Sequence, residues 1–349
     1  MAKKKKNERI DYPSVVRALK KDGPQRLYLL WGEEEYLREK YLEELKALCL
    51  PEGEDGFSFK RFNGPELDPR ALQQAVDAVP FLSERSFVEL RDVDLAHLSD
   101  PDGVARVLSD IPDYCTIAFV QNASFEPDNR LKLFKLFQTQ GVDLRFDSQN
   151  QDELTKWIAR RFAALNKGIE MEASQRLIFI SGDLMNRLIP EIEKVAAFAK
   201  GEKVTVADVE AVATHIPEAV IYDMTDLIAQ KKINNAFAVL AELLSDRNNE
   251  PIPMLAMLGI QMRRLYAAKL AAEQGLGVPY VMETCGVKYE SHANTLLRTA
   301  RGFTLPQLKR AVEICAETDY RMKSSGLDAK ELFKEAVLRI AAGEIDAQR

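Results

Sequence analysis

The 349-residue sequence predicts an α/β domain followed by two all-helical domains. Three observations lead to this prediction. Short apolar runs alternate with helical patterns as far as Phe146, which is typical of a parallel sheet covered by helices. A polar run without periodicity follows at 147–152, and only helical patterns come after it. We therefore place the domains at 1–147, 148–215 and 216–349, with the second boundary at a short break around 215–218.

A composition of 46% hydrophobic and 29% charged residues is typical of a folded globular protein. The sequence contains no apolar run of membrane-spanning length and no secretory signal, so we expect a cytoplasmic protein. A net charge of −6 weighs against nucleic-acid binding over the whole surface, although the basic run at 3–6 could contact phosphates. The four cysteines lack metal-binding spacing and the three histidines are far apart. We therefore expect no metal, no cofactor and no histidine-based catalysis.

The first domain begins with the arrangement that carries a phosphate loop in nucleotide-binding folds. The apolar run 27–31 predicts a strand, Gly32 closes it, and an apolar stripe predicts a helix over 33–48. Later strands are predicted at 57–62 and 86–90, and at 115–120, where a continuous apolar run is typical of a buried parallel strand. The fold class is therefore that of a P-loop NTPase.

The residues at this position do not fit the chemistry of a phosphate loop. The motif GxxxxGK[ST] uses backbone N–H groups, a lysine and a hydroxyl to bind phosphates and magnesium. Counted from Gly32, these places are occupied by Leu37, Arg38 and Glu39, and the acidic run 33–35 would repel phosphate. The predicted strands 86–90 and 115–120 also lack a following pair of acids to hold magnesium and polarise water. We predict a degenerate phosphate loop.

An apolar turn follows the predicted helix 71–79, whose stripe includes Val79. Pro80 ends that helix, so Phe81 and Leu82 leave its register in a connection that is normally polar. Two explanations fit the residues. The pair could fold back as a local hydrophobic plug, or it could be an exposed anchor for a pocket on another protein.

The remainder of the chain reads as helices. Apolar stripes occur at 154–162 and 177–180, and a further helix is predicted over 183–200 with a kink at Pro190. Thr205 and Asp208 form a capping-box pattern for a helix through 214. Beyond it, helices are predicted at 222–229, 235–244, 254–274, 306–324 and 328–342. The apolar positions of 254–274, including Ile260, predict a helix buried on several sides.

Taken together, these stretches resemble the delta subunits of the bacterial DNA polymerase III clamp loader. The resemblance covers roughly 25–342, and it depends on the order and spacing of several short pieces. Pro190 departs from the polar residue usual at its position. The matching pieces are 28–37, 80–82, 182–184, 191–194, 222–227, 236–244, 262–265, and Asp319 with Lys323.

This resemblance implies an AAA+-like first domain, a helical lid and a helical collar that joins a ring of five subunits. It implies a subunit of a DNA-directed DNA polymerase that does not itself hydrolyse ATP. Its expected partners are the sliding clamp (beta subunit), the gamma/tau and delta prime subunits, and primed DNA. The apolar turn would be the wedge that enters the clamp's pocket. The implied clamp-binding residues are Phe81 and Leu82, supported by Pro80 and Val79.

Positive charge in the last domain suggests a possible DNA contact, although a solvated helical face explains it equally well. Two other functions remain open: an active DNA-dependent ATPase, such as a helicase loader or branch-migration motor, and a helical scaffold with a vestigial nucleotide fold. The basic residues in question are Arg298, Arg301, Lys309, Arg310, Arg321 and Lys323.

Overall fold

The computed structural model describes residues 11–50, 58–80, 83–246 and 249–344. The chain divides into two compact units, which we describe separately. The first unit comprises Met1–Gln149 together with Leu184–Asn186, and the second comprises Asn150–Asp183 with Arg187–Arg349. The predicted boundary at 215/216 falls inside the second unit.

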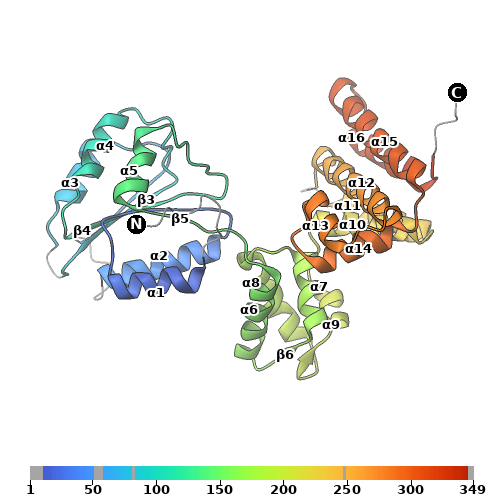
Figure 1. The fold of residues 1–349 in the computed structure, drawn as a ribbon, viewed down its shortest axis with the longest axis horizontal. Helices are drawn as coiled ribbons and strands as arrows, with labels where there is room; N and C mark the ends of the chain where they lie inside the picture. Colours follow the sequence, from blue (N-terminus) through green and yellow to red (C-terminus); the bar gives the residue numbers. More distant parts are fainter. Residues whose placement is uncertain (1–10, 51–57, 81–82, 247–248, 345–349) are drawn as a thin grey trace. The chain divides into compact units, whose positions relative to one another are not determined.

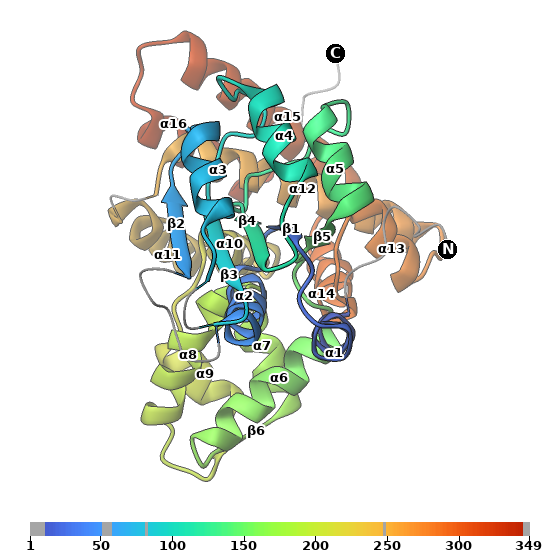
Figure 2. The same ribbon diagram turned by 90° about the vertical axis from the view of Figure 1, so that its left-hand side faces the viewer.

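A five-stranded, fully parallel sheet forms the centre of the first unit (Figures 1 and 2). Its strand order is β2-β3-β4-β1-β5, which confirms the predicted α/β fold. The register places Leu30 opposite both Val120 and Leu144. The strands are β1 (Leu27–Trp31), β2 (Phe59–Asn63), β3 (Ser86–Arg91), β4 (Cys115–Val120) and β5 (Val142–Arg145).

Helices cover both faces of this sheet. Alternate residues of β1, among them Leu29, pack in one core with α3, α4 and α5, while Tyr28 faces the opposite way and its ring contacts Tyr41 of α2. Burial on both faces explains why β1 and β4 are continuous apolar runs. These helices are α1 (Tyr12–Asp22), α2 (Glu35–Cys49), α3 (Pro69–Asp77), α4 (Pro101–Ser109) and α5 (Lys132–Gln140).

The prediction that a helix over 71–79 buries Val79 was wrong. Helix α3 ends at Asp77, Ala78 is extended with φ −65° and ψ 110°, and Val79 is 72% exposed. The physical reason is Pro80, whose ring disfavours helical backbone at the residue before it, so the helix ends early. Val79 is thereby left outside the buried stripe.

The second unit is helical apart from one short parallel strand pair. Thr205 and Asp208 form the predicted capping box, which starts α9, and α8 continues through Pro190. Helices α13 and α14 were not predicted. The elements are α6 (Gln151–Ala164), β6 (Gly168–Ile169), α7 (Met171–Ser181), α8 (Met185–Phe198), β7 (Lys203–Val204), α9 (Val206–Val212), α10 (Pro217–Ala229), α11 (Ile233–Ser245), α12 (Pro251–Glu273), α13 (Val278–Cys285), α14 (Glu290–Ala300), α15 (Leu305–Ser324) and α16 (Ala329–Ala341).

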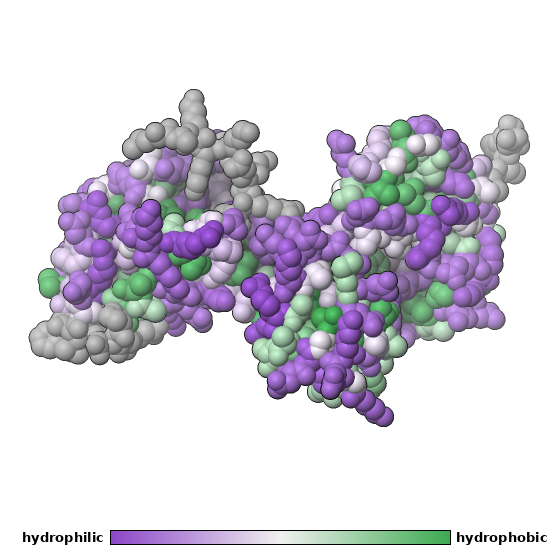
Figure 3. Space-filling view, turned by 60° about the horizontal axis from the view of Figure 1, so that its bottom comes forward, coloured by the Kyte–Doolittle hydropathy of each residue, from purple (hydrophilic) through white to green (hydrophobic). Residues whose placement is uncertain are grey.

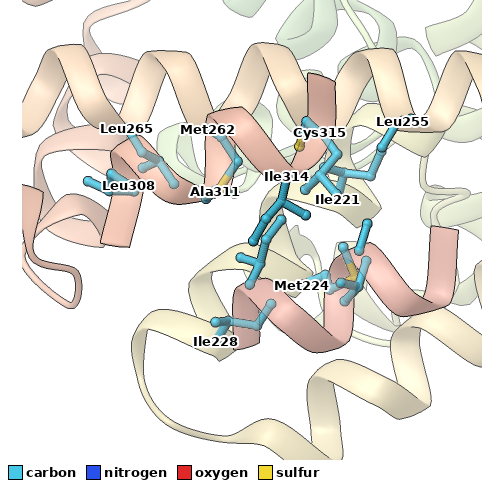
Figure 4. Packing of buried hydrophobic residues seen from close by; sticks show 14 of the residues in the cluster. Ile221, Met224, Ile228, Leu255, Met262, Leu265, Leu308, Ala311, Ile314 and Cys315 are labelled. Atoms are coloured by element: carbon cyan, nitrogen blue, oxygen red, sulfur yellow. The ribbon is translucent and has the colours of Figure 1, made fainter. Parts of the chain in front are cut away.

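Helix α12 lies at the centre of the α10–α16 bundle. Its Leu255, Met262 and Leu265 are buried and pack with residues of α10 and α15 such as Met224 and Ile314 (Figure 4). The predicted burial on several sides is therefore confirmed for most of the helix. It was wrong for Ile260, which is 41% exposed.

The face of the described chain drawn in Figure 3 is mostly hydrophilic, and its hydrophobic residues lie in separate groups. Within the described ranges, none of the helices has the length and apolar character needed to cross a membrane.

Candidate functional site

The four residues of the predicted phosphate loop lie together at the end of β1 and in the first turns of α2. Strand β1 ends at Trp31 and α2 begins at Glu35, so only 32–34 separate the two elements. A phosphate loop places most of the GxxxxGK[ST] motif before its helix. Here Leu37, Arg38 and Glu39 are all inside α2. The connection is too short to wrap around a phosphate chain.

The protein's own backbone packs against this short connection. Gly32 has φ +113°, and a Cβ built there would lie 2.4 Å from the carbonyl oxygen of Phe146. The same carbonyl accepts a hydrogen bond from the N–H of Glu34 (2.9 Å), and the N–H of Phe146 donates to the carbonyl of Trp31 (2.7 Å). At Glu34, an N–H group that would face an anion in a phosphate loop is bonded to Phe146 instead.

Arg38 occupies the interior of this site. Its side chain is buried, and Nη1 donates to the carbonyl oxygen of Gly32 at 2.9 Å. Burial lowers the pKa of Arg38, although the carboxylates of Glu39 and Glu35, with ion-pair distances of 3.8 and 3.9 Å, partly offset this effect. The guanidinium is therefore committed to the chain's own carbonyl, and Leu37 is buried in the core beside it.

Glu39 takes part in an ion network that links α2 to the neighbouring strands β2 and β3. Its two carboxylate oxygens accept from Nη1 and Nη2 of Arg91 at 2.9 and 2.7 Å. Arg91 also bonds the fully buried Glu89, which lies 3.0 Å from both Lys46 and Arg61. The hydrogen bond to Glu39 is the main cause of the raised pKa of Arg91. The residue at the magnesium-binding hydroxyl position is thus a structural carboxylate.

A hollow of about 350 Å³ lies beyond the carboxyl ends of β3 and β4. Its lining includes the carboxylates of Asp92, Asp94, Glu126 and Asp128, which would repel a phosphate group. Among the residues that the structure describes, no group of three or more His, Cys, Asp or Glu side chains is arranged to hold a metal ion.

Of the apolar turn, Val79 and Pro80 belong to the described chain, whereas Phe81 and Leu82 lie outside the described residues. Val79 is exposed and Pro80 is half-buried. Tyr114 contacts both flanks of the turn, because its hydroxyl donates to the carbonyl of Asp77 (3.4 Å) and its carbonyl accepts from the N–H of Ser86 (2.7 Å). Sequence reasoning missed Tyr114, since no local pattern connects it with residues about thirty positions earlier.

The six basic residues of the last domain fall into two groups. Arg298 and Arg301, at the end of α14, are exposed and have no ion pair within the described ranges. The other four side chains are engaged with carboxylates. These contacts are Lys309 with Glu313 (3.9 Å), Arg310 with Glu317 (2.7 Å) and Glu344 (2.9 Å), Arg321 with Glu335 (2.6 Å), and Lys323 with Asp319 (2.8 Å).

Comparison with known proteins gives one consistent result. Residues 28–146 match the family model described as "DNA polymerase III, delta subunit", and residues 218–340 match "DNA polymerase III delta subunit, C-terminal domain". The DNA polymerase III subunit delta of Bacillus subtilis is 24% identical over 337 residues, covering 93% of this chain and 96% of that protein. The Escherichia coli subunit is 18% identical over 314 residues, covering 89% and 90%.

The solved structure of the Bacillus subtilis DNA clamp loader delta protein has the same fold. It aligns with a TM-score of 0.53 and 22% identity, covering 95% of this chain and 99% of that one. The two family matches fall in the α/β unit and the helical unit and together span more than half of the chain. The chain therefore belongs to the DNA polymerase III delta subunit family.

Proposed function

We propose that this protein is a clamp-loader subunit that binds a sliding clamp and helps to open it, without hydrolysing ATP itself. The main support for the absence of ATP hydrolysis is Arg38, whose buried guanidinium bonds the carbonyl of Gly32 inside the degenerate loop. The loading role follows from family membership and from the name of the Bacillus subtilis structural match. ATP would then act in other subunits of the complex.

The proposed clamp contact is the apolar turn, with Phe81 and Leu82 as anchors and Pro80 and Val79 beside them. Exposure of Val79 supports an outward-facing apolar surface next to these two residues. The hydrogen bonds of Tyr114 to both flanks would limit the entropy lost when the turn enters a pocket. A wedge of this kind opens a ring only if it binds the open form more tightly than the closed form.

We further propose the assembly that the family implies. Helices α6–α9 would form a lid (148–215), and α10–α16 would form a collar (216–349) within a five-membered ring. The partners would be the clamp, the gamma/tau and delta prime subunits, and primed DNA, in the cytoplasm. The packing of α10–α16 around α12 supports a collar that folds as one body.

Replacing Phe81 and Leu82 by alanine is expected to weaken clamp binding at least roughly tenfold for each side chain, because buried apolar anchors dominate such interfaces. The affinity of each variant for the sliding clamp is measured by surface plasmon resonance. Leu48→Ala, which shortens another exposed apolar side chain of the same unit, serves as the control and should bind normally. Unchanged binding by the double variant would favour a helical scaffold instead.

The isolated chain is expected to retain no ATP in a filter-binding assay at micromolar nucleotide. The physical reason is that the short connection, the acidic residues beside it and Arg38 leave no cradle for phosphates. Competition with unlabelled ATP identifies specific retention. Micromolar affinity would instead indicate an active ATPase.

We propose that Arg298 and Arg301 are the DNA-contacting members of the basic set, because the other four are paired. Charge reversal of both residues is expected to weaken binding of the assembled loader to primed DNA. The slope of log affinity against log salt should fall by about 0.9 for each lost phosphate contact. Lys323→Glu, at a residue already paired with Asp319, is the comparison and should change the slope less. An unchanged slope in the double variant would mean that these arginines belong to a solvated face.

A further inference from the structure

Three consecutive glutamates, Glu33, Glu34 and Glu35, occupy the place where a phosphate loop would bind its anion. Within the first unit, each of them accepts a hydrogen bond from a distant part of the chain. Oε1 of Glu33 accepts from the N–H of Ser148 (3.3 Å), and Oε2 of Glu34 accepts from the N–H of Met185 (3.2 Å). Oε2 of Glu35 accepts from Nδ2 of Asn186 (3.0 Å). We call these three residues the acidic triplet.

The partners of the acidic triplet stand beside the points where the chain passes between the two units. The first unit ends at Gln149, one residue after Ser148, and it includes the short returning segment Leu184–Asn186. Two stretches of the first unit, the one ending at Gln149 and the segment Leu184–Asn186, are therefore bonded to consecutive residues of one loop. This loop stands at the carboxyl end of β1, the strand between β4 and β5.

The contact of Glu34 has the chemistry of anion binding at a helix N-terminus. Met185 is the first residue of α8, a 14-residue helix, so its N–H has no partner within the helix. The N-terminus of a helix carries partial positive charge and binds carboxylates and phosphates in the same way. Glu34 is 0% exposed, so its bond to Met185 is made away from water.

We propose that the acidic triplet is a built-in substitute for a bound phosphate. Its carboxylates offer the oxygen acceptors that phosphate would offer, and they hold Ser148, Met185 and Asn186 in the first unit without a ligand. Arg38 completes the substitution, because its guanidinium lies 3.9 Å from the carboxylate of Glu35 and is bonded to Gly32. This inference does not depend on clamp binding.

The test removes the carboxylate that is fully buried. In Glu34→Ala, the amide of Met185 should lose protection against hydrogen exchange by roughly tenfold or more, as expected when a charge-assisted hydrogen bond is lost. Exchange is followed by mass spectrometry on a peptide that begins upstream of Gly182, because the first two residues of a peptide lose their label during digestion. Glu34→Gln keeps an acceptor oxygen without the charge and should show a smaller loss. If Glu34→Ala does not fold, exchange at Met185 is measured in Glu34→Gln. Glu43→Ala is the matched control. It changes an exposed glutamate of α2 and should exchange like the parent protein.

Chemical rescue separates an anion substitute from a merely structural side chain. Added sulfate should restore protection at Met185 in Glu34→Ala, because removal of the carboxylate leaves the N–H at the start of α8 without its acceptor. The parent protein and Glu43→Ala should not respond. The proposal is overturned if Glu34→Ala leaves Met185 protected. It is equally overturned if sulfate raises protection by the same factor in the parent protein and in the variant.

Discussion

Gly32→Ala is expected to destabilise the α/β unit by about 3–5 kcal/mol. Two effects add. Alanine rarely adopts the φ of +113° found at this position, and its Cβ would lie 2.4 Å from the carbonyl oxygen and 2.8 Å from the nitrogen of Phe146. These are backbone atoms, and hydrogen bonds to Trp31 and Glu34 hold them in place. Relief of the clash would therefore require moving the segment that follows β5.

The measurement is urea unfolding followed by the fluorescence of Trp31. The chain has two tryptophans, so a Trp157→Phe background lets the signal report on the first unit alone. Gly64→Ala is the matched control. Gly64 also has a positive φ, of +100°, but a Cβ there would meet nothing within 4 Å, so this variant carries the backbone strain without the clash. Equal destabilisation of the two variants would show that contact with Phe146 contributes nothing.

Most strands could be predicted because burial on both faces leaves a plain signal in the sequence. Strand β4 was predicted with its observed ends, since all six of its residues are apolar or small and are buried. Strand β5 gives a weaker signal, because its four residues alternate between apolar and charged at the sheet edge. Helices α13 and α14 were missed for a related reason. They are short or rich in polar residues, and they are ordered by packing against α12, which no local pattern encodes.

The departure of these residues from the phosphate-loop motif could be recognised from residue types alone, because charge sign and motif spacing are local properties. The contacts that these residues make instead could not be predicted. Arg38 bonds a residue six positions earlier, but the contact of Phe146 with Gly32 joins residues more than a hundred positions apart. The pairing of the basic residues is hidden in the same way. Arg310, for example, meets Glu344 only because α15 and α16 fold against each other.

Glu89→Ala is expected to destabilise the first unit by about 2–3 kcal/mol, because it removes the buried carboxylate that Lys46, Arg61 and Arg91 share. Glu89 is 0% exposed on the internal strand β3, with Lys46 and Arg61 each 3.0 Å away and Arg91 also bonded to it. The effect is limited because Arg61 and Arg91 are 39% and 29% exposed, so their charges can regain water, and Arg91 keeps its hydrogen bonds to Glu39. The unfolding midpoint is measured as for Gly32→Ala.

The pH dependence of this contribution gives the sharper test. Burial alone would raise the pKa of Glu89, but hydrogen bonds and charge from Arg91 and Lys46 outweigh it, so the pKa is held below the ordinary 4.5. A carboxyl with a lowered folded-state pKa stabilises the protein above pH 4.5, and this contribution is lost as pH falls through the folded-state pKa. Glu89→Gln has the shape of the protonated acid. The stability gap between parent and variant should therefore be widest near neutral pH and should close on acidification.

Asp128→Asn separates this effect from ordinary surface pairing. Hydrogen bonds from Arg130 lower the pKa of Asp128 to about 2, yet Arg130 is 90% exposed, so solvent screens the pair. This variant should unfold almost like the parent at neutral pH. If Asp128→Asn and Glu89→Gln shifted the unfolding midpoint equally, the burial of Glu89 would not explain its contribution to stability. A gap for Glu89→Gln that stayed constant from neutral pH to well below 4.5 would mean that the carboxylate charge plays no part.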